Sequence, residues 1–416
     1  MKKIDTTPFD RKRIPPKQNL FMTPFIWLIC RFSVMGYRLK IKKVRMKGLK
    51  PPFLVLGTHH SFMDFIVTPL ALFPHRANYV SELEGFENYG EWLYRQLGCL
   101  GTRKFVNDIS LIKNIRRVMD RKGILVMYPE ARYANVGTSS EIPASVGKLV
   151  KYLDVPVAVI NMKGNYLQSP IWNLKARKEA RLEATITQVF TREEIKNASS
   201  EEIQKKLSEY LEYDEYRYQY ENKIAITYKK RAEGIEAALY QCPSCKTEFK
   251  METSDADISC SSCGYTRHMT EYGRMVSKDG SEDDFSHIPF WYEWERKNTE
   301  KEIDEGKYSL DMKVRIESLP NAVNFIDLGE GRLKHCREGY YLTFKDYGKE
   351  EDTMFFPSAS MTSVHTEYDY RGKGQCITLS TPDNTYFIFP LEDGFNSTKI
   401  QFATEYFFKL AKNDPV

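Results

Sequence analysis

Two residues of this chain, His59 and Asp64, are suited to proton transfer and stand at the ends of a six-residue block, His-His-Ser-Phe-Met-Asp, at 59–64. A neutral imidazole can take a proton from a hydroxyl near pH 7, and a carboxylate can orient the ring and stabilise the imidazolium that forms. An offset of five residues puts two side chains on different faces of a helix. The pair can therefore meet only if His59 lies in a turn and Asp64 lies in the first turn of the following helix.

The same block has a purely structural interpretation. Ser61 falls where an N-cap belongs, and Asp64 follows three residues later, near the positive end of the helix dipole. A Ser-x-x-Asp sequence can cap a helix, and His59 would then be an ordinary loop histidine. The sequence around the block distinguishes between the catalytic and the structural interpretation.

The elements that would position this pair form an α/β pattern. Apolar strands are predicted at 53–56, 124–128 and 155–160, with helices from about 61 and 110 between them. Unbroken apolar strands that alternate with helices indicate a mostly buried sheet. We therefore expect an α/β domain over residues 51–190, a sheet with flanking helices.

Four blocks of this domain resemble the glycerolipid acyltransferase family, which includes the 1-acylglycerol-3-phosphate acyltransferases. They are His-x4-Asp at 59–64, Gly-Thr-Arg-Lys-Phe at 101–105, Tyr-Pro-Glu at 128–130 and Val-Pro-Val at 155–157. Their order and approximate spacing follow the family over roughly residues 20–190. The combination is far more specific than any single block.

The resemblance implies an acyltransferase in which His59 is the general base and Asp64 orients it. The base would deprotonate an acceptor hydroxyl that attacks a thioester, acyl-CoA or acyl-carrier protein, so no enzyme nucleophile is needed. This agrees with the absence of a Gly-x-Ser-x-Gly motif and of a phosphate-binding glycine loop with its lysine. The resemblance also implies a substrate-binding role for Glu130, the next best match to the family after His59 and Asp64.

Two blocks depart from the family pattern. The family commonly has Pro-Glu-Gly-Thr-Arg, whereas Arg132 here stands one position early, and Asp108 occupies a position where the family often has arginine. Arg103, Lys104 and Arg132 are candidates for binding an acceptor phosphate. The alternative is that they are solvated surface cations. The acceptor is a lysophospholipid or another lipid-linked or phosphorylated alcohol.

Length and charge indicate several domains and one basic end. The chain has 416 residues, 42% of them hydrophobic, enough for two or three domains with proper cores. Residues 1–50 hold fourteen Lys or Arg against two Asp, a balance of +12, so the remainder of this +5 chain sums to −7. The basic end favours a surface of anionic lipid.

An apolar segment at 20–37 lies inside this basic end. Arg31 near its centre would cost about 2.5–3.5 kcal/mol in a spanning helix. Its apolar side chains recur at helical spacing: Phe25, Leu28, Ile29, Phe32, Met35 and Leu39. We expect residues 1–50 to be a basic amphipathic segment that lies in the membrane interface on the cytoplasmic side, making the protein peripheral. The alternative is a terminal helix docked on the catalytic domain. No signal peptide is evident.

Four cysteines form the pattern C-x2-C-x14-C-x2-C: Cys242, Cys245, Cys260 and Cys263. Four thiolates in two close pairs can close a tetrahedral site, which predicts a structural Zn²⁺ in a ribbon over 241–270. Two disulfides are the alternative. Acidic residues outnumber basic ones in the ribbon, so nucleic acid is not expected as a partner.

Two further regions complete the chain. Residues 191–240 are predicted as a charged helical connector that begins with a capping box, Thr191-x-x-Glu194. Residues 306–412 are predicted as a β-rich domain that ends in a helix at 397–410. The predicted strands are 309–316, 332–345, 353–365, 376–380 and 386–389. Strands followed by a terminal helix resemble a pleckstrin-homology-like barrel, a likeness of fold that implies no particular ligand.

The sequence therefore predicts a peripheral membrane acyltransferase with a zinc ribbon and a β-rich module. The rival from another class is an inactive acyltransferase-like scaffold whose two C-terminal modules bind partners. The departures around Arg132 favour the rival, and the intact His59, Asp64 and Glu130 favour the enzyme.

Overall fold

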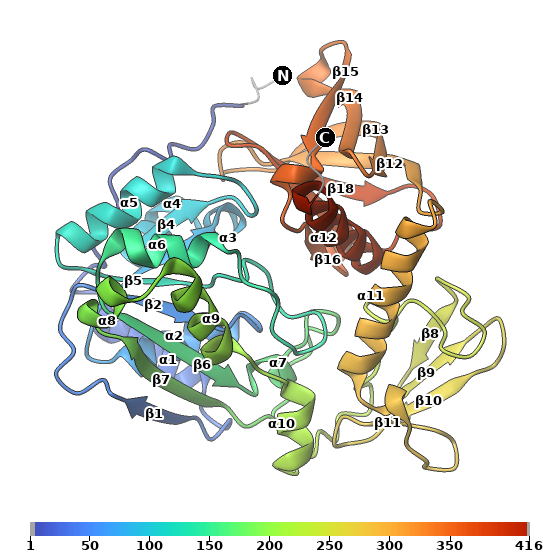
Figure 1. Ribbon diagram of the computed structural model, residues 1–416, viewed down its shortest axis with the longest axis horizontal. Helices are drawn as coiled ribbons and strands as arrows, with labels where there is room; N and C mark the ends of the chain where they lie inside the picture. Colours follow the sequence, from blue (N-terminus) through green and yellow to red (C-terminus); the bar gives the residue numbers. More distant parts are fainter. Residues whose placement is uncertain (1–4, 414–416) are drawn as a thin grey trace.

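The computed structural model describes residues 5–413, so the first four residues of the predicted basic segment lie outside it. Figure 1 shows an α/β unit, a small second sheet and a β-rich C-terminal domain. The long helix α11 (Ile288–Asp304) leads from the small sheet to the C-terminal domain.

The α/β unit is built on a seven-stranded sheet with strand order β1-β7-β6-β2-β5-β3-β4. Among its neighbouring strands only β6 and β7 run antiparallel. In order across the sheet, the strands are β1 (Lys40–Val44), β7 (Glu183–Phe190), β6 (Val157–Lys163), β2 (Phe53–Gly57), β5 (Ile124–Met127), β3 (Asn78–Glu82) and β4 (Cys99–Thr102). The predicted α/β sheet with buried central strands is confirmed.

Helices cover both faces of this sheet, which is why β2 is apolar without interruption. Phe53 and Val55 pack into one core and Leu54 and Leu56 into the other. The second core is closed by α5 (Ile109–Asp120), α6 (Ser145–Leu153), α8 (Arg192–Asn197) and α9 (Ser200–Leu211). The first is closed by α2 (Met63–Leu72), α3 (Leu83–Tyr89), α7 (Asn165–Gln168) and α10 (Glu215–Glu221), with α4 (Glu91–Gln96) following α3.

The segment predicted as a connector therefore supplies part of the α/β unit. Its capping box is present, since Thr191 Oγ1 accepts from the Glu194 backbone N–H and Glu194 accepts from the Thr191 N–H. Ile203 and Leu207 of α9 are fully buried against the sheet. After α10 the chain runs without long elements through the short 3-10 turn η1 (Ile235–Ala237) to the small sheet.

The apolar N-terminal segment forms the helix α1 (Thr23–Ser33), shorter than the predicted span. Trp27 contacts Phe73 with ring centroids 4.4 Å apart, so one edge of α1 is docked on the α/β unit. Five of the six side chains predicted to form an apolar face are exposed, Phe25 66%, Leu28 54%, Ile29 62%, Phe32 59% and Met35 71%, whereas Leu39 is partly buried against the core of the α/β unit. Within residues 5–413, none of the helices has the length and apolar character needed to cross a bilayer.

The small sheet carries the four paired cysteines. Its strands are antiparallel in the order β11-β10-β9-β8: β11 (Met275–Val276), β10 (Thr266–Met269), β9 (Asp257–Cys260) and β8 (Met251–Ser254). The turn η2 (Asp284–Ser286) then leads into α11. Trp291 of α11 is fully buried, and its indole N–H donates to the Gln241 carbonyl at 3.0 Å, which fixes the helix beside the first cysteine pair.

The C-terminal domain has seven antiparallel strands in the order β15-β14-β13-β12-β18-β17-β16, followed by α12 (Ser397–Asn413). The strands are β12 (Leu310–Ser318), β13 (Ile326–Cys336), β14 (Gly339–Lys345), β15 (Glu351–Pro357), β16 (His365–Glu367), β17 (Cys376–Ser380) and β18 (Thr385–Pro390), with short turns η3 (Asp346–Gly348), η4 (Ser358–Ser360) and η5 (Tyr370–Gly372). The predicted β-rich domain and terminal helix are confirmed.

Two of the predicted strands are each divided in the structure. The prediction of one strand over 332–345 is wrong, because a two-residue turn at 337–338 separates β13 from β14 and pairs Cys336 with Gly339. The turn-forming residue is Gly339, which closes the turn and begins β14 with a φ of +144°. The predicted strand over 353–365 is also wrong, because β15 ends at Pro357 and η4 follows it.

Candidate functional site

The block at 59–64 forms a turn at the carboxyl end of β2, where the chain passes into α2. The Thr58 N–H donates to the Ile160 carbonyl of β6 at 3.1 Å, which fixes the start of the turn on the neighbouring strand. His59 Nδ1 and Asp64 Oδ2 are 3.1 Å apart, so the two side chains meet across the turn as their spacing predicts. The N-cap position is Phe62 and not Ser61, although Ser61 Oγ accepts from the Met63 N–H at 3.3 Å.

Asp64 is held by four donors. Its Oδ2 accepts from the backbone N–H groups of His60 at 2.6 Å and Ser61 at 3.1 Å, besides the His59 ring, and its Oδ1 accepts from Asn165 Nδ2 at 2.8 Å. The residue is fully buried. Charge-assisted bonds of this kind keep a carboxylate in one position. With Nδ1 of His59 donating to Asp64, Nε2 is the ring nitrogen left with a lone pair.

Aromatic side chains surround the His59 ring. Tyr128 stacks on it with centroids 4.6 Å apart, Tyr133 lies at the same distance with tilted rings, and Phe65 packs edge-on at 5.8 Å. The His59 side chain is 10% exposed. This packing fixes the ring plane and shields the imidazole from bulk water.

His60 is a structural residue. It is fully buried, its Nε2 lies 2.9 Å from Thr58 Oγ1, and its ring packs on Tyr213 at 4.0 Å. Burial lowers the pKa of His60 to about 4. A neutral, enclosed imidazole of this kind supports the turn, while its neighbour His59 has the carboxylate partner.

Glu130 fastens the turn to two other segments. Its Oε1 accepts from the His59 N–H at 3.1 Å, and its Oε2 accepts from the Ser140 N–H at 2.8 Å and the Tyr213 hydroxyl at 3.1 Å. Burial raises the pKa of Glu130 to about 7. Both oxygens are engaged by protein donors, so in this structure Glu130 acts on the backbone that carries His59.

Arg103 and Lys104 both reach the C-terminal domain. Arg103 donates to the carbonyl of Leu319 at 2.8 Å and that of Pro320 at 2.7 Å in the β12–β13 loop, and also to Thr385 Oγ1 at 2.8 Å. Lys104 forms an ion pair with Glu82 and lies 2.9 Å from His365 Nε2 of β16. Burial lowers the pKa of Arg103 to about 10.

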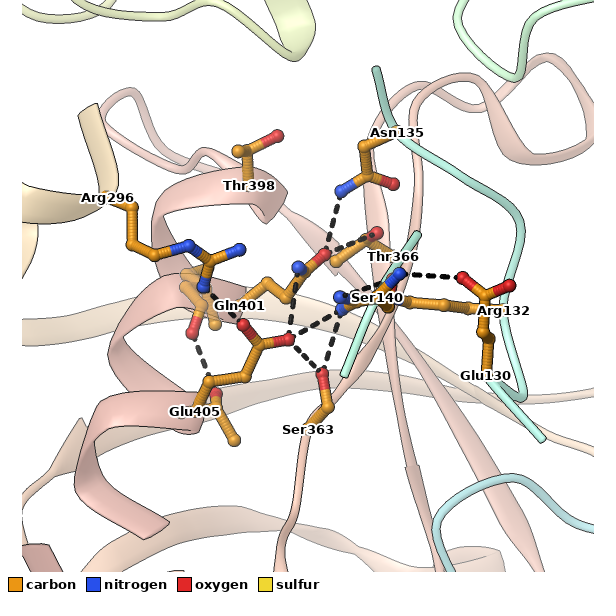
Figure 2. A network of polar contacts seen from close by, with 12 residues as sticks. Glu130, Arg132, Asn135, Ser140, Arg296, Ser363, Thr366, Thr398, Gln401 and Glu405 are labelled. Carbon is orange, nitrogen blue, oxygen red and sulfur yellow. Dashed lines mark hydrogen bonds and ion pairs between the residues drawn. The ribbon is translucent and has the colours of Figure 1, made fainter. Parts of the chain in front are cut away.

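Arg132 also contacts the C-terminal domain, through α12 (Figure 2). Its Nη1 lies 2.8 Å from Glu405 Oε1 and donates to Ser363 Oγ at 2.9 Å, while its Nη2 donates to Ser140 Oγ at 3.2 Å. Arg132 and Arg103 are 6% and 5% exposed. The interpretation of these two arginines as solvated surface cations is therefore wrong.

Three residues of the site were not found from the sequence. Asn165 on α7, Tyr128 at the end of β5 and Tyr213 before α10 contact Asp64, His59 and His60 respectively. Tyr128 belongs to the Tyr-Pro-Glu block at 128–130, but the family resemblance implied no function for its side chain. Asn165 and Tyr213 stand in segments with no motif, so only the packing of the chain brings them to the turn.

The four paired cysteines converge at one end of the small sheet. Their sulfur atoms all lie within 4.8 Å of one another, with Cys242 to Cys263 at 3.7 Å and Cys245 to Cys260 at 3.8 Å. Four sulfurs bound to Zn²⁺ at about 2.3 Å in a tetrahedron lie about 3.8 Å apart, whereas a disulfide needs about 2.05 Å. Over residues 5–413 all eight cysteines are free. The donor set and its spacing fit a metal ion.

Residues 38–163 match the protein-family model described as Acyltransferase. The matched segment includes the turn at 59–64, Glu130, Arg103, Lys104 and Arg132. Among solved structures, the chain is similar to the 1-acyl-sn-glycerophosphate (LPA) acyltransferase PlsC from Thermotoga maritima, at 16% identity and a TM-score of 0.37 over 46% of this chain and 77% of that chain. None of the curated proteins matches the chain significantly.

The buried His60 generates a prediction about acid stability. Its pKa is about 4 in the folded protein and about 6.5 in an unfolded chain, so between these values the unfolded state binds more protons. The contribution of neutral His60 to the free energy of unfolding is fully present above pH 6.5 and is lost as the pH falls towards 4. We expect the free energy of unfolding to decrease more steeply with falling pH for wild type than for His60→Gln. Between pH 7 and pH 4 the wild type should lose roughly 3 kcal/mol more than the variant.

Denaturant unfolding followed by circular dichroism at pH 7, 6, 5 and 4 measures this difference. Other titrating groups are common to both proteins and cancel. Parallel stability curves for the two proteins would show that His60 is not held neutral by burial.

Proposed function

We propose that this protein is an O-acyltransferase that moves a fatty acyl group from acyl-CoA or acyl-carrier protein to the hydroxyl of a lysophospholipid or glycerol-phosphate-like acceptor. The observation that carries this proposal is the pairing of His59 with a buried, four-donor Asp64 inside the segment that matches the Acyltransferase family. Such a pair prepares an imidazole to accept a proton at Nε2.

The reaction follows from that geometry. His59 Nε2 removes the proton of the acceptor hydroxyl as its oxygen attacks the thioester carbonyl, and Asp64 stabilises the imidazolium that forms. The tetrahedral intermediate then breaks its carbon–sulfur bond, and the imidazolium returns the proton to the departing thiolate. Asn165 and Glu130 hold the carboxylate and the His59 backbone, and they are positioning residues in this scheme.

An inactive scaffold is the second candidate. Its support is the low exposure of His59 and the engagement of Arg103, Lys104 and Arg132 by protein groups. Against it stands the cost of a buried carboxylate, since an ionised group without solvent lowers stability unless its partners compensate. The contacts of Asp64 with His60 N–H, Ser61 N–H and Asn165 would serve a scaffold equally, but its contact with the His59 ring is the one that a general base requires.

The cysteine cluster is proposed as a structural zinc site. Cys242, Cys245, Cys260 and Cys263 supply four thiolates at tetrahedral spacing, which leaves no open position for a reacting water. Its role would be to hold the small sheet and the base of α11 together.

The helix α1 is proposed as a membrane-interface element on the cytoplasmic side. Its exposed row of Phe25, Leu28 and Phe32 has exposed cations on either side, Lys17 before it and Arg38 after it. An apolar face with flanking cations suits insertion among the headgroups of anionic lipid. Docking of Trp27 on the α/β unit would then orient the catalytic domain against the surface.

The C-terminal domain is proposed to be pleckstrin-homology-like. Support comes from its seven antiparallel strands, whose order across the sheet is the fourth to the first and then the seventh to the fifth, with a helix after the last strand. Its ligand is not implied by this fold.

The first functional prediction concerns catalysis. Purified protein is offered lysophospholipids, glycerol 3-phosphate and neutral alcohols with both thioester donors, and products are identified by mass. Losing a general base costs about 10²- to 10⁴-fold in rate, so we expect His59→Ala to lower turnover by that factor and Asp64→Asn to be almost as damaging. His60→Gln is the matched control and should be much milder. A folded His59→Ala protein with wild-type turnover would falsify the assignment.

The second concerns the metal. We expect the protein to purify with about one zinc ion per chain, measured by atomic emission. Cys245→Ser should lower this content and increase proteolysis after residue 240, because the thiolates close one site. Cys336→Ser is the control, since that cysteine lies in β13. A metal-free native protein would contradict the proposal.

The third concerns the membrane. Replacing Phe25, Leu28 and Phe32 together by Ser should release the protein from vesicles that contain anionic lipid, yet leave activity on detergent-dispersed acceptor. Wild-type binding should weaken with salt, because each cation near the surface contributes about 1 kcal/mol and is screened. Ser at Val323, Phe355 and Leu391, three exposed apolar residues of the C-terminal domain, is the control. Loss of detergent activity in the α1 variant would instead favour the docked-helix alternative.

A further inference from the structure

The carboxylate of Glu405 on α12 lies between two guanidinium groups (Figure 2). Its Oε1 is 2.8 Å from Arg132 Nη1 of the acyltransferase domain, and its Oε2 pairs with Arg296 of α11. Ser363 Oγ donates to the same carboxylate at 2.7 Å, and Gln401 Nε2 donates at 3.2 Å. Donors from three segments distant in sequence, together with Gln401 of α12 itself, therefore converge on one anion.

This anion is strongly stabilised where it lies. Burial opposes the ionisation of Glu405, but the charges of Arg132 and Arg296 outweigh it and lower the pKa of the carboxyl to about 2. Two guanidinium forks with nearby hydroxyls are also the donor set that suits a phosphate. The second hydroxyl is that of Ser140, which already accepts from Arg132.

The convergence point opens onto a cleft with room for a ligand. The cleft has a volume of about 510 Å³ and is lined by Arg132, Arg296, Ser140, Ser363 and Glu405, with Lys409 and Lys412 of α12 adding two further cations. Glu130 also lines it, and the same carboxylate accepts from the His59 backbone N–H. None of residues 59–64 lines the cleft, so Glu130 is the residue that connects a ligand there to the turn that carries His59.

We propose that Arg132 and Arg296 form a binding site for a phosphate monoester, and that Glu405 occupies this site in the structure described here. The proposal rests on the proposed function, because a phosphorylated acceptor is the ligand that would need such a site. A phosphate dianion placed beside an ionised Glu405 would be repelled by it. Phosphate and Glu405 therefore compete for the two arginines.

The competition has a structural consequence. Glu405 is on α12, so its displacement removes the contacts that tie this helix to Arg132 and to Arg296. The contact of Arg103 with the β12–β13 loop does not depend on Glu405 and would keep the C-terminal domain attached. Ligand binding would thus loosen the cleft side of the C-terminal domain without releasing it.

The test is calorimetric titration of the full-length protein with inorganic phosphate, glycerol 3-phosphate and detergent-dispersed lysophosphatidate, with glycerol as the uncharged reference. Glu405→Gln removes the competing charge and should tighten phosphate binding about tenfold or more. Glu293→Gln is the matched control, since Glu293 also pairs with Arg296 but is half-exposed. It should change the affinity less than about twofold. Tight binding of inorganic phosphate would identify free phosphate as sufficient, whereas tight binding of glycerol 3-phosphate or lysophosphatidate alone would identify a phosphorylated headgroup as the ligand.

Unchanged or weaker phosphate binding by Glu405→Gln would overturn the proposal and leave Glu405 as a structural ion pair only. Adding Arg296→Gln to Glu405→Gln should abolish the gain, and a gain that survives would place the phosphate elsewhere and also overturn it. If Glu405→Gln does not fold, hydrogen exchange of wild-type α12 decides: phosphate should increase it, and no change or a decrease contradicts the competition. Because none of these readouts needs acyl transfer, a failure of the proposed activity remains distinguishable.

Discussion

The buried carboxylate of Asp64 is the group on which the geometry of the site depends. An ionised carboxylate without solvent needs several donors, and Asp64 finds them in the two backbone N–H groups of its own turn, in Asn165 and in the ring of His59. The turn is thereby closed on itself, and the histidine is fixed by the same carboxylate that would stabilise its charged form. Glu130 then ties the His59 backbone to more distant segments.

The same requirement explains how the C-terminal domain is attached. Arg103 is buried and always charged, so its N–H groups must find acceptors, and the carbonyls of Leu319 and Pro320 supply them. Arg132 is buried as well, and the carboxylate of Glu405 supplies an acceptor for its guanidinium. Cations near the turn at 59–64 therefore join two domains, because carbonyl and carboxylate groups of the C-terminal domain bind them.

The helix α11 links this interface to the cysteine cluster. Glu295 is fully buried and accepts from the Gln241 N–H at 2.7 Å, next to the first cysteine, and burial raises its pKa well above the ordinary value. The next residue, Arg296, forms an ion pair with Glu405. Because consecutive residues of one rigid helix make these two contacts, the integrity of the small sheet bears directly on where Arg296 lies.

The sequence determined what depends on a few neighbouring residues: the meeting of His59 with Asp64, the cysteine pairs, the buried strands and the amphipathic α1. It did not reveal the hairpin turn at 337–338, because strand-like residues lie on both sides and Gly339 is the one turn-forming residue there. Nor did it reveal the partners of the cations, since Arg132 and Ser363 are separated by 231 positions. Contacts of that range arise only when whole domains pack. The residue types of the candidate site can be read from the sequence, whereas the tertiary structure decides which of these side chains meet.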